Sequence, residues 1–162
     1  MMVEREYSAI EVRELIQKIF PQRKLVLSQF TFFNHVGVAK PSGETFRRGR
    51  RCYRLVDLLS VVTVLALKEQ GIPLKNIDLV PSLIQENAQT IFNIGAGCRL
   101  SGHGSTVSLN LPNQNSANEA LDSLLGGEMR KDILFWSYDV GLLARQLQEV
   151  AEQDLRQFSI AA

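Results

Sequence analysis

The chain has 162 residues, of which 45% are hydrophobic and 22% charged, and this ordinary globular usage excludes disorder as the global state. The apolar stretch without charge from Leu58 to Leu67 is much shorter than the roughly 18 residues that a membrane span requires. The N-terminus lacks the apolar core of a signal peptide. The only two cysteines, Cys52 and Cys98, stand far apart, which excludes a disulfide scaffold and zinc-knuckle spacing. We therefore expect a cytoplasmic protein with no membrane partner.

Charge is unevenly distributed along the chain. Residues 1–75 hold 13 lysines and arginines against 7 acidic residues (net +6), whereas residues 76–162 hold 5 against 10 (net −5). The segment from Lys40 to Arg54 carries six basic side chains, five of them arginine, against the single acid Glu44. Guanidinium groups match phosphate oxygens better than lysine does. This pattern predicts a basic half that meets a polyanion, with a solvated loop as the alternative.

Two short helices are predicted first. Ser8 is expected to cap the first one, with Glu11 completing a capping box, and Pro21 ends it. A second, shorter helix is predicted from Leu25 to Val36, with Gly37 as its stop.

A hairpin and further helices are predicted next. Residues 44–55 form two short extended pieces around a basic tip centred on Gly49, which favours a β-hairpin. The apolar stretch that begins at Asp57 and ends at Gly71 favours a buried helix over a strand, because of its length, acidic start and glycine stop. Further helical pieces are expected at residues 71–77, with proline in the first turn, and from Pro81 to about Phe92.

The middle of the chain is rich in glycine and predicts strands in place of helices. Glycines at 95, 97, 102 and 104 and the alternation after them predict a second hairpin that turns near Gly102-His103-Gly104. Pro112 to Asn118 reads as a polar linker, and Glu119 to Leu125 as a short helix.

The tail from Asp132 to Phe158 has the clearest periodicity, with apolar residues spaced 3, 4, 3, 4, 3. This alternation is typical of a coiled-coil seam and predicts a dimerisation helix. A single amphipathic helix packed on its own domain is the alternative. The predicted seam consists of Ile133, Trp136, Val140, Leu143, Leu147 and Val150.

Catalytic and metal chemistry are not expected. His103 beside Ser105 lacks an acid to orient the imidazole. Cys98 and His103 have the chemistry to share a metal between two subunits, but a buried Cys98 and an exposed His103 are favoured. We therefore predict no enzyme, no cofactor and no metal site.

The order of two short helices, a turn, a basic hairpin and two further helices is typical of a winged helix-turn-helix. Over residues 8–80 the chain resembles the MerR-type transcriptional regulators. The resemblance lies in Gly37-Val38-Ala39-Lys40-Pro41, in Tyr53-Arg54-Leu55, in Asp57-Leu58, and in Glu69-Gln70-Gly71-Ile72-Pro73-Leu74-Lys75-Asn76-Ile77. It implies a DNA-binding dimer. The family's Arg-Tyr-Tyr-Glu on the recognition helix stands here as Thr31-Phe32-Phe33-Asn34, so those phosphate contacts do not carry over.

The predicted DNA-binding residues lie in the second helix and the hairpin. Polar side chains of the helix are expected to read base edges in a major groove, and the hairpin arginines to hold phosphates or enter a minor groove. Lys40 and Arg54 are expected as flanking phosphate contacts; Tyr53 belongs to the same set, although its ring is expected in the core. The helix contributes Gln29, Thr31, Asn34 and His35, and the hairpin Arg47, Arg48, Arg50 and Arg51.

We thus expect a mainly α fold: a winged helix-turn-helix domain over 1–80, a linker or sensor segment with a hairpin over 81–130, and a dimerisation helix over 131–162. The predicted function is sequence-specific binding of double-stranded DNA, at an inverted repeat, by a homodimer that acts as a bacterial transcriptional regulator with an unknown effector. The alternatives are an architectural or excisionase-like DNA binder, a protein-interaction adaptor with a degenerate winged domain, and a small enzyme in the middle segment.

Overall fold

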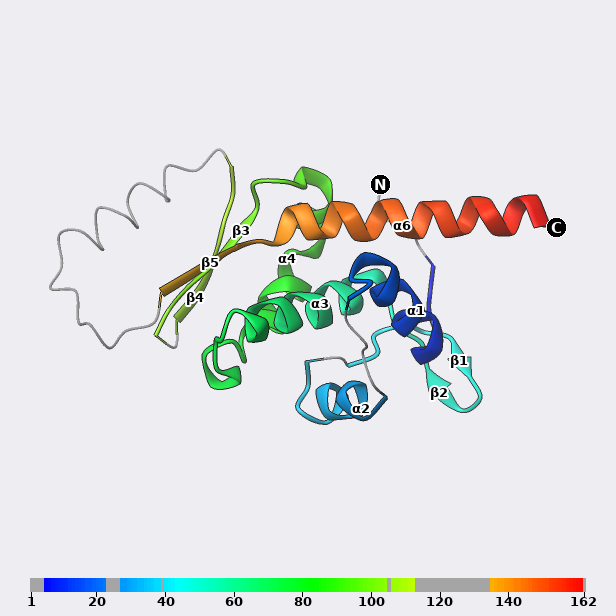
Figure 1. Cartoon of the computed structure of the whole chain (residues 1–162), viewed down its shortest axis with the longest axis horizontal. Coiled ribbons are helices and arrows are strands. Elements are labelled where there is room, and N and C mark those ends of the chain that lie inside the picture. Colours follow the sequence, from blue (N-terminus) through cyan, green and yellow to red (C-terminus); the bar gives the residue numbers. More distant parts are fainter. Residues whose placement is uncertain (1–4, 23–26, 39, 105, 113–134, 162) are drawn as a thin grey trace, which may run out of the picture.

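The computed structural model describes residues 5–22, 27–38, 40–104, 106–112 and 135–161. A long C-terminal helix, α6, runs along one side of the molecule (Figure 1). The helices α1, α3 and α4 lie beneath it, α2 and a small hairpin lie on the far side of these helices, and a three-stranded sheet stands at one end. No helix in the described part of the chain is long and apolar enough to cross a membrane.

The first helix begins and ends as predicted. In α1 (Ala9–Ile19) the Ser8 hydroxyl accepts a hydrogen bond from the backbone N–H of Glu11, and the Glu11 carboxylate accepts one from the N–H of Ser8, which completes the capping box. The second helix, α2 (Leu27–His35), is followed by Gly37 at φ 83°, a left-handed conformation that glycine adopts without strain.

The basic hairpin is also confirmed. Strands β1 (Phe46–Arg47) and β2 (Arg50–Arg51) pair antiparallel, with Phe46 opposite Arg51 and Arg47 opposite Arg50. The two residues of the turn, Arg48 and Gly49, both have positive φ, at 52° and 74°. Two successive left-handed residues match the twist of the flanking strands, which is why this turn closes a tight hairpin.

The central helix is buried almost throughout. It is α3 (Leu55–Glu69), in which every residue from Leu55 to Val64 is buried. The β-branched residues favour a strand by propensity, but packing on all sides stabilises the helix instead. A short 3-10 helix, η1 (Leu74–Asn76), and the helix α4 (Val80–Ile94) follow it, close to the predicted positions.

The predicted hairpin in the middle of the chain is confirmed and belongs to a larger sheet. Strand β3 (Arg99–His103) pairs antiparallel with β4 (Thr106–Asn110) and with β5 (Phe135–Asp139), in the order β4-β3-β5. The third strand was not predicted, because its residues matched the helical repeat of the tail.

The predicted start of the C-terminal helix, near Asp132, is therefore wrong. Trp136 lies on β5, opposite Gly102, and α6 (Val140–Ala161) begins only after Asp139. The Asp139 carboxylate accepts a hydrogen bond from the N–H of Leu142 and so caps the helix. Aromatic residues at 135, 136 and 138 favour the strand. Ile133, also placed in the predicted seam, lies outside the described residues.

The described residues of the predicted seam, Trp136 on β5 and four residues of α6, pack within their own chain. Trp136, Val140, Leu143 and Leu147 are at most 5% exposed in the single chain, and Val150 packs partly buried against the same core. These five side chains are therefore not available as a seam between subunits in this arrangement. For the four residues on α6, Val140, Leu143, Leu147 and Val150, the packing matches the alternative of an amphipathic helix packed on its own domain.

One continuous core runs across the predicted boundaries at residues 80 and 130. It joins Tyr7 and α1, through α3 and α4, to Leu100 of the sheet and to Ala151 of α6. Lys18 of α1 forms an ion pair with Asp154 of α6, which ties the two ends of the described chain together. The described architecture is mainly helical with small antiparallel sheets. The helix predicted at 119–125 lies outside the described residues.

Candidate nucleic-acid interface

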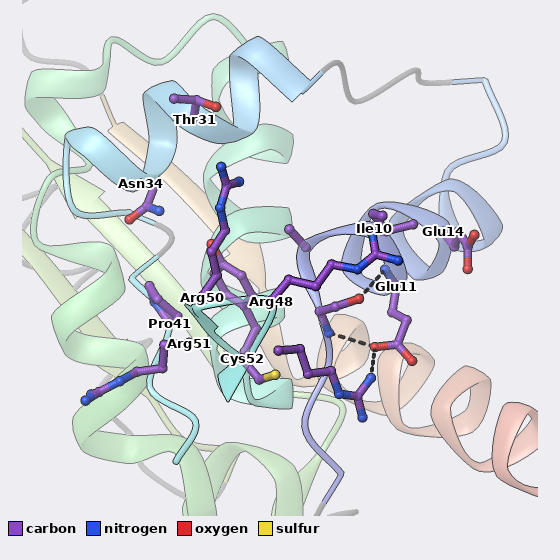
Figure 2. Close-up of a pocket in the computed structure, with 14 residues that line it drawn as sticks. Ile10, Glu11, Glu14, Thr31, Asn34, Pro41, Arg48, Arg50, Arg51 and Cys52 are labelled. Atoms are coloured by element: carbon purple, nitrogen blue, oxygen red, sulfur yellow. Dashed lines mark hydrogen bonds and ion pairs between the residues drawn. The ribbon is translucent and has the colours of Figure 1, made fainter. Parts of the chain in front are cut away.

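A groove of about 1090 Å³ lies between the basic hairpin and the helices α1 and α2 (Figure 2). Its walls combine the hairpin arginines with polar residues of α2 and with the first turns of α1. This places the four predicted hairpin arginines and two of the four predicted α2 residues, Thr31 and Asn34, around one groove, although Asn34 and Arg47 are thirteen positions apart in the sequence. The lining residues are Ser8, Ala9, Ile10, Glu11, Glu14, Thr31, Asn34, Pro41, Arg47, Arg48, Arg50, Arg51, Cys52 and Tyr53.

The four hairpin arginines differ in how they are held. Arg47 donates from Nη1 to Glu11 Oε2 at 2.8 Å, and this contact joins the hairpin to α1. The guanidinium of Arg51 lies 5.5 Å from the ring centroid of Phe46 and points away from α1 (Figure 2). Arg48 and Arg50 have no ion-pair partner among the described residues. Their guanidinium groups are exposed in the groove and available to an anionic ligand.

The segment before α1 holds the hairpin in place. Tyr7 and Tyr53 exchange two backbone hydrogen bonds, at 2.8 and 2.7 Å, so residue 7 pairs with the chain that leaves β2. The Glu6 carboxylate accepts hydrogen bonds from the N–H groups of Glu44 and Thr45, both at 2.7 Å. Gly43 packs so closely that a Cβ there would lie 2.6 Å from the Cys52 carbonyl oxygen. The hairpin is thus anchored at its base, while its tip is exposed.

Both carboxylates at this junction are stabilised in their charged form. Hydrogen bonds from the side chain of Thr45 and from the backbone of Glu44 and Thr45 lower the pKa of Glu6 from its ordinary value of 4.5. For Glu11, partial burial raises the pKa, but the hydrogen bonds from Ser8 and the charge of Arg47 outweigh it, so that its pKa is lowered overall. The anchors therefore stay ionised at neutral pH.

The polar residues of α2 divide between two faces of the helix. Thr31 and Asn34 line the groove. Gln29 lies on the other face, where it lines a smaller pocket of about 350 Å³ together with Phe33 and Lys68. His35 is exposed and lines neither pocket. The predicted base-reading set is therefore reduced to Thr31 and Asn34 within the groove.

The two predicted flanking contacts, Lys40 and Arg54, and the third residue of the set, Tyr53, lie away from the hairpin tip. Lys40 is exposed but does not line the groove. Arg54 is exposed as well, and its guanidinium lies 3.5 Å from the Glu44 carboxylate. Tyr53 is only 5% exposed, and burial raises the pKa of its hydroxyl. Tyr53 is thus part of the core, as its ring was expected to be, and supports the hairpin from below.

One wall of the groove was missed by sequence reasoning. The first turns of α1 contribute Ile10, which is 56% exposed, and the acidic residues Glu11 and Glu14. Ile10 was expected in the apolar stripe of α1 with Leu15 and Ile16 but is exposed, and helical spacing carried the signal, because it places Ile10 on the side away from Val12 and Leu15. The groove therefore has a basic wall on the hairpin and an acidic and apolar wall on α1.

The residues considered for other chemistry lie apart from the groove. Cys98 is buried, which raises the pKa of its thiol, and His103 is exposed on β3, as favoured above. Ser105 lies outside the described residues. Within the described ranges, no group of three or more His, Cys, Asp or Glu side chains is arranged to hold a metal ion.

Comparison with protein-family models and with curated proteins identified no relative of this chain. No protein-family model matches the chain, and no curated protein is significantly similar to it in sequence. The resemblance to MerR-type regulators therefore rests on the residues quoted above.

Proposed function

We propose that this chain binds double-stranded DNA in the groove between the hairpin, α1 and α2. The observation that carries the proposal is that four hairpin arginines and the polar residues Thr31 and Asn34 line a single groove. The guanidinium groups of Arg48 and Arg50 are exposed there without an ion-pair partner in the described chain, so binding phosphate breaks no ion pair seen here. Planar guanidinium forks suit phosphate oxygens.

Base reading is assigned to the groove face of α2. The Asn34 amide has the donor and acceptor that pair with an adenine edge, and Thr31 suits either a hydrogen bond or a thymine methyl contact. Both side chains are exposed, and both come from the helix that stands beside the hairpin. Phosphate contacts from the hairpin would then set the register, while α2 would supply sequence preference.

The proposal retains a homodimer that acts as a transcriptional regulator at an inverted repeat. Its contact surface must differ from the apolar stripe of α6, since that stripe is buried in the single chain. The last turns of α6 are the available alternative. They extend past α1 in Figure 1 and present Ile160, which is 85% exposed.

A salt titration and a selection of genomic fragments test the proposal together. If each subunit neutralises ~4 phosphates, log K against log salt should have a slope of about −7 for a dimer, from about −0.9 per phosphate. A slope flatter than about −2 would contradict the assignment of the hairpin. Enrichment of a few inverted repeats supports a specific regulator, whereas uniform retention of all fragments indicates an architectural binder.

One observation favours a second candidate, a protein-interaction adaptor. The α1 wall of the groove carries Glu11 and Glu14, and Glu11 already engages Arg47. Carboxylates facing the ligand disfavour a polyanion but suit a partner surface of mixed charge. If replacing Arg47 and Arg50 with alanine leaves DNA retention unchanged, the adaptor becomes the better description.

A further inference from the structure

A buried carboxylate connects the hairpin with a helix outside the groove. Asp57, in the first turn of α3, is 1% exposed and accepts four hydrogen bonds. Its Oδ2 accepts from the N–H and the hydroxyl of Ser42, at 2.9 and 2.8 Å, and from the N–H of Arg54 at 2.8 Å. Its Oδ1 accepts from Nε2 of Gln85 on α4, at 2.8 Å.

The two oxygens of Asp57 face different parts of the molecule. Ser42 precedes β1 and Arg54 follows β2, so Oδ2 holds both ends of the hairpin segment. Within the described part of the chain, Oδ1 accepts its hydrogen bond from the Gln85 side chain. Because a carboxylate is a rigid planar group, a constraint on Oδ1 also fixes the direction in which Oδ2 meets its donors.

The helix that carries Gln85 is fixed to the rest of the fold. α4 packs on α3 and α6, and its residues Ile84 and Ile91 are fully buried. The η1 residue Asn76, just before α4, donates from Nδ2 to the carbonyl oxygen of Gly104, in the turn between β3 and β4, at 3.0 Å. The chain from η1 to α4 therefore contacts the sheet through Asn76, and through Gln85 it contacts the Asp57 carboxylate, which holds both ends of the hairpin segment.

We propose that Gln85 is a positioning residue, which sets the hairpin relative to α2 by orienting the Asp57 carboxylate. The groove width would then depend on where α4 sits. The consequence for DNA affinity rests on the function proposed above. The coupling between Gln85 and the hairpin does not depend on that function, and it is measurable without DNA.

A substitution at Gln85 can remove this hydrogen bond with little other change to the structure. The Gln85 side chain is exposed apart from its hydrogen bond, so methionine of similar length removes the donor with little loss of packing. Oδ1 then loses its donor, and a water that takes the donor's place would not fix the carboxylate's direction. Gln89, one turn further along α4 and also exposed, offers a matched control.

Amide hydrogen exchange on the full chain, without DNA, tests the coupling. The reporters are the N–H of Cys52, bonded to the Thr45 carbonyl at 2.9 Å, and the N–H of Gly43, bonded to the Cys52 carbonyl at 3.0 Å. In Gln85→Met these amides should exchange about three- to tenfold faster, as expected for one lost side-chain hydrogen bond. Exchange in Gln89→Met should be unchanged, and Gln85→Lys, which keeps a donor, should restore slow exchange. The buried Val62 of α3 exchanges through global unfolding and reports the overall loss of stability in each variant.

Three possible outcomes decide whether Gln85 positions the hairpin and whether the chain binds DNA. Equal exchange of the hairpin amides in Gln85→Met and Gln89→Met overturns the positioning role. So does faster exchange at Val62 with unchanged exchange of the hairpin amides, because the hydrogen bond then stabilises the fold without positioning the hairpin. If the hairpin responds as expected but the unsubstituted chain retains no DNA, the coupling stands and the DNA-binding proposal fails.

Discussion

Arg47 on the hairpin and Glu11 on α1 meet at 2.8 Å and connect the two walls of the groove. The contact is half-exposed on the arginine side, with 48% of that side chain accessible. Surface ion pairs of this kind stabilise by at most about 1 kcal/mol, so a phosphate competes with Glu11 for the guanidinium at little cost. Arg48 and Arg50, with no such competitor among the described residues, should contribute more to DNA affinity than Arg47 does.

The first prediction concerns these arginines. Replacing both Arg48 and Arg50 with alanine should weaken DNA binding and reduce the salt slope by about 2 per subunit, since two phosphate contacts are lost. Fluorescence anisotropy at several salt concentrations measures both quantities. Arg145→Ala, on the exposed face of α6, is the control and should leave the slope unchanged. A double variant that binds like the control would show that the hairpin does not hold DNA.

The second prediction separates the two faces of α2. Asn34→Ala should relax sequence preference at one base pair by about 1–3 kcal/mol, whereas Gln29→Ala should not, because Gln29 lines the opposite pocket. Binding selection from a randomised site measures the preference of each variant. Equal effects of the two substitutions would contradict the assignment of base reading to the groove face.

The third prediction follows from the two anchoring carboxylates. Because the pKa values of Glu6 and Glu11 are lowered by folding, their contribution to stability is present above the ordinary value of 4.5 and is lost as pH falls through the folded-state pKa. Urea midpoints measured between pH 7 and pH 3 should therefore fall with pH. Glu6→Gln should flatten this dependence, with Glu86→Gln, an exposed residue of α4, as the control. An identical pH profile in Glu6→Gln and in the unsubstituted chain would refute the anchoring role.

The fourth prediction concerns the sheet. A Cβ at Gly102 would lie 2.1 Å from the indole of Trp136 on the neighbouring strand, which leaves no space for a methyl group. Gly102→Ala should reduce the free energy of unfolding by about 1–3 kcal/mol, the usual range for overpacking. Chemical denaturation measures this, and Ser108→Ala, at an exposed position of β4, should change it little. Similar stability of the two variants would mean that Trp136 does not pack over Gly102.

The fifth prediction distinguishes the two parts of α6. Leu143→Asp places an unpaired charge in the core and should destabilise the chain by at least ~3 kcal/mol, rather than yield folded monomers. Ile160→Asp should leave the fold intact and convert a dimer into monomers if the last turns pair the subunits. Circular dichroism and a sizing column report the two effects. A folded Leu143→Asp monomer would restore the apolar stripe as the seam.

Local sequence signals determined much of this protein. The capping box at Ser8 and Glu11, the hairpin tip at Gly49 and the approximate boundaries of α4 depend on a few adjacent residues, so they were predicted close to where they lie. The concentration of arginine between residues 40 and 54 likewise followed from composition.

Only the tertiary structure decided what the apolar stripe of the tail covers and which polar residues share a surface. A 3, 4 spacing is the same whether the helix meets a second chain or its own core, and here Leu143 and Leu147 face the core of the same chain. Trp136 fits the helical repeat but pairs with β3, because a strand partner nearby in space satisfies its backbone. Likewise, Gln29 and Asn34 are equally polar in sequence, and only the packing of α2 against α3 turns one away from the groove and the other into it.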